Sequence, residues 1–412
     1  MTSTFARPQL LAWRNATFAV FALAGIALAS WVSRLPSVRD ALGIELDQVG
    51  ILMFGLASGS IVGLLFSSHL IARFGARASV LAGLIVVSTG ITVAGIGAQF
   101  GIFAVAWIGL FVFGSAAGIT DVAMNVSGAA NERALGKAIM PIFHAFFSFG
   151  TMIGAAVGAL AAAVALPVAI HMAIVAAIMV TVTLVSYRFL QNDSGEAESS
   201  AEDDSSLTWR GRLSIWRDPR TILIGLVVLA AAFAEGSAND WLTIAMVDGH
   251  HVTEASGALV FGVFVTAMTA GRLGGVVLLN RFGRVPVLRA SFLVAGLGLL
   301  VVIIVPDPII ATIGAAAWGL GSALGFPIGM SAAADDPKTA AARVSAVATI
   351  GYLAFLAGPP LIGVLGQNVG ILNALLVVLV LCVAGGIVAS AARERADATT
   401  STDTFADPNL PR

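Results

Sequence analysis

Charged residues are scarce in this chain of 412 residues. Asp, Glu, Lys and Arg together make up only 11% of it, whereas about a quarter of an ordinary soluble domain is charged. Hydrophobic residues make up 58%, and the mean hydropathy is +0.95. One buried core does not need so many apolar residues, so they must form long spans that face lipid or one another. The composition excludes a water-soluble globule and indicates a polytopic membrane protein.

Cysteine and nucleotide-binding motifs are also lacking. The single cysteine, Cys382, excludes an internal disulfide and a Cys-x-x-Cys metal or haem site. Residues 131–138 end in Gly-Lys-Ala and lack the first glycine and the Ser or Thr of a phosphate-binding loop. Lys and Arg are scattered singly or in pairs, without the basic stripe that nucleic acid requires. We therefore expect no metal, no cofactor, no ATP and no nucleic acid, with protons as the suspected coupling ion.

Twelve stretches are long and apolar enough to span a bilayer as helices, which takes about 20 residues each. They begin near Thr17, Val49, Ser79, Gly101, Met140, Val168, Thr221, Ala255, Val287, Ile309, Ala342 and Ile371. The predicted organisation is a six-helix bundle at 1–190, a cytoplasmic linker at 191–220, a second six-helix bundle at 221–392 and a polar tail at 393–412. The linker is expected to end in an interfacial helix that carries Trp209 and Trp216.

The distribution of basic residues fixes the expected orientation. With the N-terminus placed in the cytoplasm, all but three of the 22 Lys and Arg fall in cytoplasmic segments. The exceptions are Arg34 and Arg39, in outer loops, and Arg272, within a span. Since Lys and Arg concentrate in cytoplasmic loops, both termini are predicted to lie inside.

The two halves of the chain repeat one another. The segment 50–55 recurs at 257–262, and 114–118 recurs at 321–325, both displaced by 207 positions. Arg-Phe-Gly at 73–75 recurs at 281–283. Two six-span halves related by such a repeat are typical of transporters that rock around a site at the membrane midplane.

The loop after the second span carries a recognisable pattern. Residues 68–77, Ser-His-Leu-Ile-Ala-Arg-Phe-Gly-Ala-Arg, and the shorter copy at 280–284 resemble a loop signature of the major facilitator superfamily. Segments 30–36, 121–125 and 140–148 resemble its MosC-like branch. Ser68 stands in place of the signature's Gly, and Ala72 in place of its Asp, which in relatives locks the inner gate.

The resemblance implies an all-α protein with twelve transmembrane helices in two pseudo-symmetric halves, working by alternating access. It implies that spans 1, 4, 7 and 10 line the cavity and that spans 2, 5, 8 and 11 flank it. Gating roles are expected for the residues of the two loops and for one arginine and one proline within spans: Arg73, Gly75, Arg77, Arg272, Arg281, Gly283 and Pro359. Pro359, which follows Gly358 and precedes a second proline, is expected to kink its span.

Few ionisable residues lie deep in spans, and each is costly there unless it faces water or a partner. Asp121 and His144 lie at similar depth, so we hypothesise a proton-sensitive pair. Glu235 is the second proton carrier or a hydrogen-bonding group for the solute. The alternatives are a static Asp121–His144 hydrogen bond, and an Arg272 that merely ties Asn280 or a helix end.

The expected solute is a small polar molecule, sugar-like or a related metabolite. The hydrogen-bonding candidates are joined by two tryptophans for ring stacking: Asn125, Ser148, Glu235, Asn239, Asp240, Trp241 and Trp31. The alternatives are efflux of drugs or amphipathic metabolites, and a non-transporting membrane sensor. We expect no enzymatic activity, and a monomer in the lipid bilayer of a bacterial inner membrane.

Overall fold

The computed structural model describes residues 6–394 except 138, 192–214 and 337–338. The predicted linker, with Trp209, and the predicted tail lie almost wholly outside these residues; Trp216 is exposed. In the described part of the chain the elements are all helices. They are α1 (Arg7–Val32), α2 (Leu35–Leu42), α3 (Leu46–Gln99), α4 (Phe103–Leu135), α5 (Met140–Ala163), α6 (Val168–Tyr187), α9 (Pro219–Ile244), η2 (Ala245–Gly249), α10 (Glu254–Phe282), α11 (Arg284–Ile304), α12 (Pro308–Ser322), α13 (Gly325–Ala333), α14 (Ala340–Val369), α15 (Ile371–Ala374), α16 (Leu376–Val388) and η3 (Ala389–Ala392).

Eleven of the helical segments in the described residues are long and apolar enough to cross a membrane. The predicted second and third spans run together in α3, whose 54 residues contain a break at Gly75 with φ 80° and ψ 158°. Glycine adopts a positive φ at little cost because it has no Cβ. The break therefore divides α3 into two arms. The predicted starts at Met140, Val168 and Ile371 coincide with helix starts, whereas α1 begins ten residues before Thr17.

Local sequence explains several helix starts. Pro219 and Pro308 occupy first helical positions, where a missing N–H is harmless. The side chains of Asp218 and Asp307, one residue earlier, accept hydrogen bonds from the first backbone N–H groups, as capping residues do. The helix α14 runs without interruption through Pro359, and the kink expected at this residue stays a prediction.

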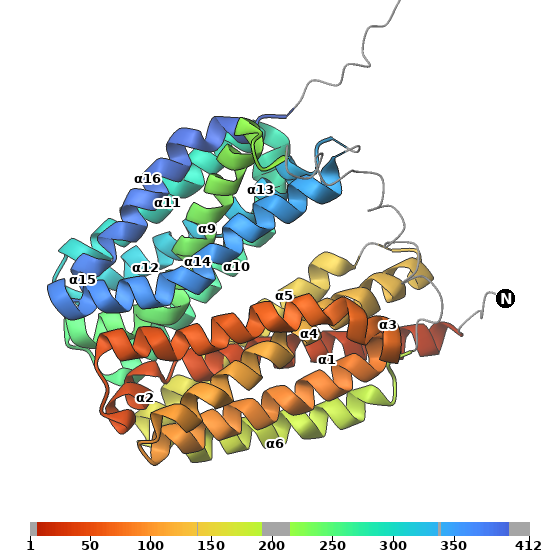
Figure 1. The fold of residues 1–412 in the computed structure, drawn as a ribbon, viewed down its shortest axis with the longest axis horizontal. Coiled ribbons are helices and arrows are strands. Elements are labelled where there is room, and N and C mark those ends of the chain that lie inside the picture. Colours follow the sequence, from red (N-terminus) through yellow and green to blue (C-terminus); the bar gives the residue numbers. More distant parts are fainter. Residues whose placement is uncertain (1–5, 138, 192–214, 337–338, 395–412) are drawn as a thin grey trace, which may run out of the picture.

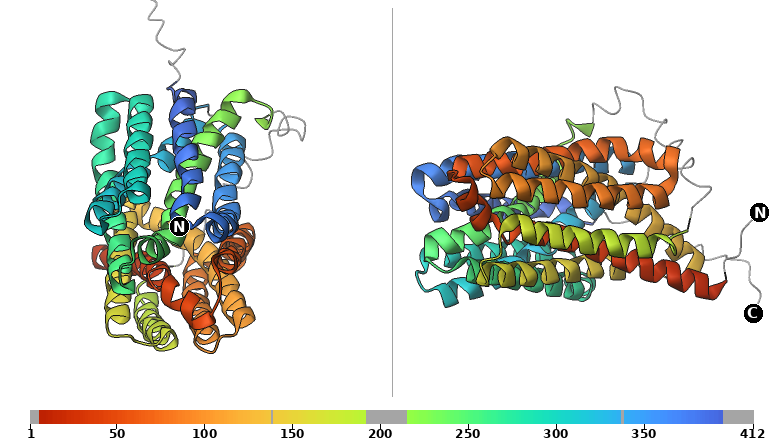
Figure 2. Two further views of the ribbon diagram at one scale, coloured as in Figure 1. Left: turned by 90° about the vertical axis from the view of Figure 1, so that its left-hand side faces the viewer. Right: turned by 90° about the horizontal axis from the view of Figure 1, so that it is seen from below.

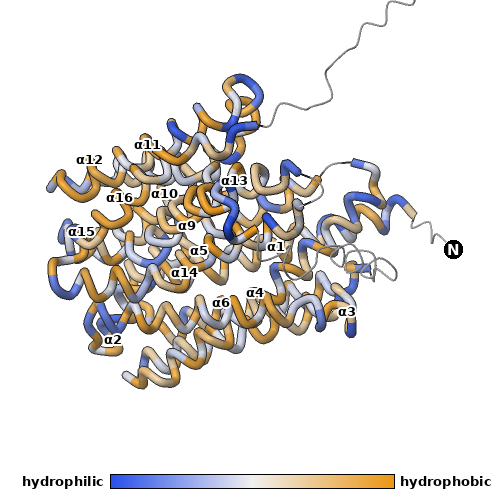
Figure 3. Tube along the Cα trace, turned by 45° about the horizontal axis from the view of Figure 1, so that its top comes forward, coloured by the Kyte–Doolittle hydropathy of each residue, from blue (hydrophilic) through white to orange (hydrophobic). Residues whose placement is uncertain are grey.

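The helices form two bundles, α1–α6 and α9–η3 (Figure 1). We call the end that holds the first turn of α1, the break in α3 and the last turn of α16 the basic end. The opposite end, which holds α2, is the α2 end. The ribbons of the two bundles approach at the α2 end and diverge toward the basic end (Figure 1), and Figure 2 shows the same assembly from two further sides. Apolar residues cover most of the helix length in both bundles (Figure 3).

Glycines set the distance between helices within the first bundle. A Cβ built at Gly63 would overlap the backbone carbonyl of Ser115, and one built at Gly114 would overlap that of Leu56. Small residues at such contacts let helix backbones approach closely in a membrane. This contact joins α3 to α4, which form part of the cavity described below.

We predict that Gly63→Ala destabilises the protein by about 1–3 kcal/mol, the usual effect of overpacking. Gly274→Ala is the matched control, because a Cβ at this position in α10 meets no atom within 4 Å. That substitution should stabilise by about 0.5–1 kcal/mol, as Ala does over Gly in a helix. Thermal unfolding of the purified protein in detergent measures both; equal effects would contradict the role given to Gly63.

Candidate functional site

A cavity of about 330 Å³ lies between the two bundles. Its walls come from α1, α3, α4 and α5 of the first bundle and from α9 and α14 of the second. Most of the lining residues are apolar. The polar ones are Ser60, Thr120, Asp121, Asn239, Asp240 and Tyr352. Helices expected as spans 1, 4 and 7 do line this cavity, whereas α12 and α13, the expected span 10, are not among its walls.

Close backbone contact closes the α2 end of the cavity. A Cβ built at Gly50 of α3 would lie 2.5 Å from the carbonyl oxygen of Pro359, in α14. One built at Gly363 of α14 would lie 2.6 Å from the carbonyl oxygen of Leu46. The Leu46 N–H donates to Oε1 of Gln367 at 3.2 Å. The two bundles therefore meet backbone to backbone, with no room for a side chain between them.

Polar ties from α2 reinforce this contact. Arg39 forms an ion pair with Asp248 in η2, and the Ser37 hydroxyl donates to Glu254 at the start of α10. Burial acts to lower the pKa of Arg39, but the charges of Asp248 and Asp40 prevail and raise it above its ordinary value. The Arg39 guanidinium therefore stays charged in its contact with Asp248.

The predicted gating residues lie at the basic end. Gly75 and Gly283 both adopt positive φ, which explains the glycine in each repeated loop. Arg73 and Arg281 are exposed, and each guanidinium lies over the ring of the following phenylalanine, at 5.5 Å and 5.3 Å from the centroid. Arg77 donates to the carbonyl oxygen of Tyr187 at 3.0 Å, a contact between α3 and the end of α6.

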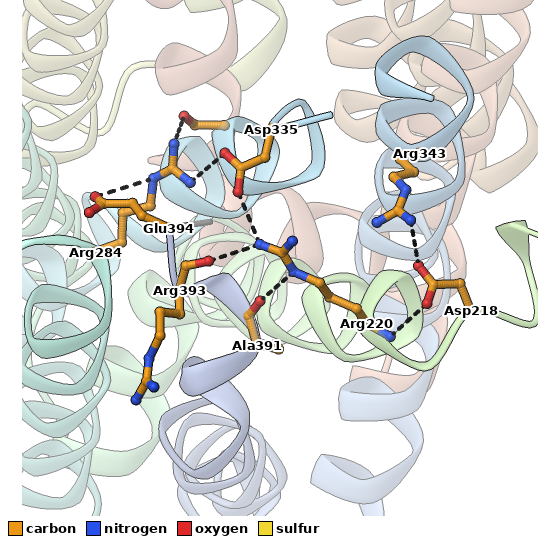
Figure 4. A network of polar contacts seen from close by, with 9 residues as sticks. Asp218, Arg220, Arg284, Asp335, Arg343, Ala391, Arg393 and Glu394 are labelled. Atoms are coloured by element: carbon orange, nitrogen blue, oxygen red, sulfur yellow. Dashed lines mark hydrogen bonds and ion pairs between the residues drawn. The ribbon is translucent and has the colours of Figure 1, made fainter. Parts of the chain in front are cut away.

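A charge network holds the basic end of the second bundle together (Figure 4). Asp335 accepts from Arg284 at 2.7 Å and from Arg220 at 3.0 Å, and Arg343 pairs with Asp218 at 3.0 Å. Burial acts to raise the pKa of Asp218, but hydrogen bonds to its carboxylate and the charge of Arg343 lower it below its ordinary value. The ion pairs drawn in Figure 4 all join elements of one bundle.

The structure does not bring Asp121 and His144 together. The Asn125 amide donates to the backbone oxygen of Asp121 at 2.8 Å and approaches its carboxylate at 3.4 Å. His144 lies on α5 with its ring edge toward Phe21, at a centroid distance of 5.3 Å. Within the described part of the chain, no hydrogen bond joins the carboxylate to the imidazole. Two residues at equal depth in the membrane lie at one level, but depth does not determine whether the helix faces that carry them point toward one another.

The alternative in which Arg272 merely ties Asn280 or a helix end has no contact behind it among the described residues, where the partner of Arg272 is Glu235. Arg272 and Glu235 pair at 2.9 Å, joining α10 to α9, with side chains 36% and 20% exposed. This ion pair neutralises both charges within spans, where an unpaired charge is costly.

The other predicted binding residues divide into two groups. Asn239 and Asp240 line the cavity, with Gly236 one turn earlier on α9. Trp31 and Trp241 are wholly buried, and neither indole N–H has a hydrogen-bond partner among the described residues. They pack in the helical core instead of lining this cavity.

Ser148 is buried, and its backbone oxygen accepts from Thr151; Asn125 contacts Asp121. Neither is among the cavity's lining residues. Sequence reasoning missed Phe113, Phe147, Tyr352 and Phe355, which do line it. Of these four, Tyr352 could have been selected from the sequence, because the chain has only two tyrosines and this one falls within a predicted span.

Comparisons with known proteins show which family and which fold this chain resembles. The sequence profile described as Major Facilitator Superfamily matches residues 16–275 and 229–409. An uncharacterised MFS-type transporter of Yersinia pestis is 30% identical over 358 residues, 84% of this chain and 87% of the relative. Membrane protein MosC of Rhizobium meliloti is 25% identical over 360 residues, 87% and 85% of the two chains.

Solved structures share the fold. The nucleoside transporter NupG (mutant form) superposes with a TM-score of 0.74 at 14% identity, covering 93% of this chain and 98% of its own. The fucose:proton symporter FucP of E. coli gives a TM-score of 0.61 at 16% identity, with 92% and 98% coverage.

We predict that Arg272→Met lowers the free energy of unfolding by about 1–3 kcal/mol, because it leaves the partly buried Glu235 carboxylate unpaired. The double variant Glu235→Gln, Arg272→Met should recover most of this loss, since it carries no charge to strand. Unfolding in detergent measures both variants. A double variant no more stable than the single one would show that Arg272 stabilises by packing alone.

Proposed function

The chain belongs to the Major Facilitator Superfamily, and on this premise we propose a secondary active transporter that moves a small molecule across the bacterial inner membrane by alternating access. The observation that carries the proposal is the cavity between two bundles that touch backbone to backbone at the α2 end. Such a site, closed on one side, is what rocking of two halves around a midplane site requires.

We propose a topology of twelve crossings, counting the two arms of α3 separately. The basic end then faces the cytoplasm, because cytoplasmic loops carry the excess of Lys and Arg. In this assignment the structure is inward-facing, with its outer side closed by α2, α3 and α14. Arg73 and Arg281, which are exposed here, are available to make inner-gate contacts when the bundles close at the basic end.

We propose that Asp121 couples transport to protons. Its side chain is exposed to the cavity, and among the described residues no basic side chain pairs with it. The other titratable side chains that line the cavity are those of Asp240 in α9 and Tyr352 in α14. Glu235 would serve as a second proton carrier only in a state that breaks its pairing with Arg272. The predicted role of His144 in proton coupling would require a conformation in which its imidazole meets the Asp121 carboxylate.

The solute is proposed to contact Asn239 and Asp240, the two predicted binding residues that line the cavity with Asp121. Because most of the lining is apolar, an amphipathic molecule is the second candidate, beside the small polar solute expected from the sequence. We propose that the protein works as a monomer, and that ion or solute gradients, not ATP or a bound cofactor, supply the energy for transport.

The test is internal pH in proteoliposomes that hold purified protein, while sugars, polyols, amino acids and organic amines are added in turn. We expect one class of solute to change internal pH, and Asp121→Asn to abolish the change. Glu45→Gln is the control, since it removes an exposed carboxylate at the start of α3 and should retain it. Proton movement that persists in Asp121→Asn would contradict the coupling role, and binding without flux would favour the sensor.

A further inference from the structure

Asp121, Glu235 and Asp240 are carboxylates of α4 and α9, two helices that line the cavity, and of these three only Glu235 has a basic partner among the described residues. Glu235 pairs with Arg272 at 2.9 Å. Among the described residues, the hydrogen bond to the Asp121 carboxylate comes from the Asn125 amide, at 3.4 Å. The Asp240 carboxylate makes no hydrogen bond or ion pair with the residues the structure describes. Two carboxylates thus stay unneutralised where an isolated charge is expensive.

The two unpaired carboxylates face the same space from opposite bundles. Asp121 comes from α4 and Asp240 from α9, and both line the cavity. None of its lining residues, all of which the structure describes, is a lysine, arginine or histidine. The protein therefore supplies an acidic group from each wall and no basic group, and an opposite charge beside an ionised carboxylate in a low-dielectric site is strongly favoured.

Aromatic rings complete the lining. Phe113 and Phe147 come from the first bundle, and Tyr352 and Phe355 from the second. A ring face attracts a cation, most strongly when the cation is desolvated. The same rings supply apolar area for a ligand's body. The Asn239 side-chain oxygen, beside Asp240, is an acceptor for N–H groups.

We propose that the cavity binds an organic cation, an amine or quaternary onium group attached to an apolar or aromatic body. This inference rests on the proposed function, because it names the substrate class of the same cavity. An anionic solute would meet two carboxylates without a counter-charge. A neutral polyol would leave both carboxylates unneutralised and most of its own hydroxyls against apolar walls, where unpaired polar groups are penalised.

The test is equilibrium binding of radiolabelled tetraphenylphosphonium to the purified full-length protein in detergent at pH 7. Three competitors of matched shape follow: phenethylammonium, phenethyl alcohol and phenylacetate. We expect saturable binding, and competition by the ammonium at least about tenfold stronger than by the alcohol or the carboxylate, as a gain of one charge interaction implies. Equal competition by the three compounds, or no saturable binding, would overturn the proposal.

Variants locate the charge that is responsible. Asp121→Asn and Asp240→Asn should each weaken tetraphenylphosphonium binding about tenfold or more, and the double variant should lose the preference for the ammonium. Asp240→Glu keeps the charge and should retain that preference. Glu45→Gln, outside the cavity, should bind as the unmodified protein does. A cation preference that survives in the double variant would refute the assignment, and the competitor series on the unmodified protein stands even if a variant fails to fold.

Flux into sealed vesicles separates this inference from the proposed function. Cation binding without uptake or exchange of the labelled cation would support the charge selectivity and contradict transport. Transport of a neutral or anionic solute, with no preference for the ammonium in binding, would support the transporter and overturn the cation assignment.

Discussion

The close approach of α3 and α14 at the α2 end is the contact on which the rest of the structure depends. Gly50 and Gly363 let the two backbones meet, at Pro359 and Leu46, so that the bundles are joined at this end. Because interfaces between packed helices are bistable and resist continuous deformation, alternating access requires this contact to open as a unit when the basic end closes. The ion pair between Arg39 and Asp248 reinforces this contact. At the basic end the ribbons of the two bundles lie apart (Figure 1).

The apolar composition makes every charge in the spans informative. A charge that the fold needs for stability is neutralised in place, as Arg272 and Glu235 are. A charge left without a counter-ion keeps its desolvation penalty until something else enters, whether a proton or a positively charged ligand. Asp121 and Asp240 belong to this second group, and both line the cavity described above, between the two bundles. This placement is why we propose that a proton or a cationic ligand neutralises them during transport.

The helical architecture was predictable from the sequence, because hydropathy reports on a property that the bilayer imposes. The family resemblance is confirmed, and so is an all-helical architecture in the described residues. Asp121 was selected by its depth in a span, and Asn239 and Asp240 were selected as hydrogen-bonding groups; all three line the cavity. Depth along a helix can be counted from the sequence, because every residue of an α-helix advances by the same rise.

Rotation and partner choice could not be predicted in the same way. Residues at equal depth, such as Asp121 and His144, face one another only if two helices are turned correctly, and packing by glycine and other small residues sets that turn. The Arg272–Glu235 pair depends on the contact between α10 and α9. The burial of Trp31 and Trp241 reflects core packing that composition does not distinguish from a ring-stacking site.

Distances measured across both ends of the molecule test alternating access most directly. In a Cys382→Ala background, one spin-label pair at Glu45 and Asn368 reports on the α2 end, and another at Ala72 and Phe282 reports on the basic end. Removing the polar tie with Arg39→Ala should populate longer distances at the α2 end and, in the same sample conditions, shorter distances at the basic end. Opening of the α2 end with no change at the basic end would contradict a rocking transporter.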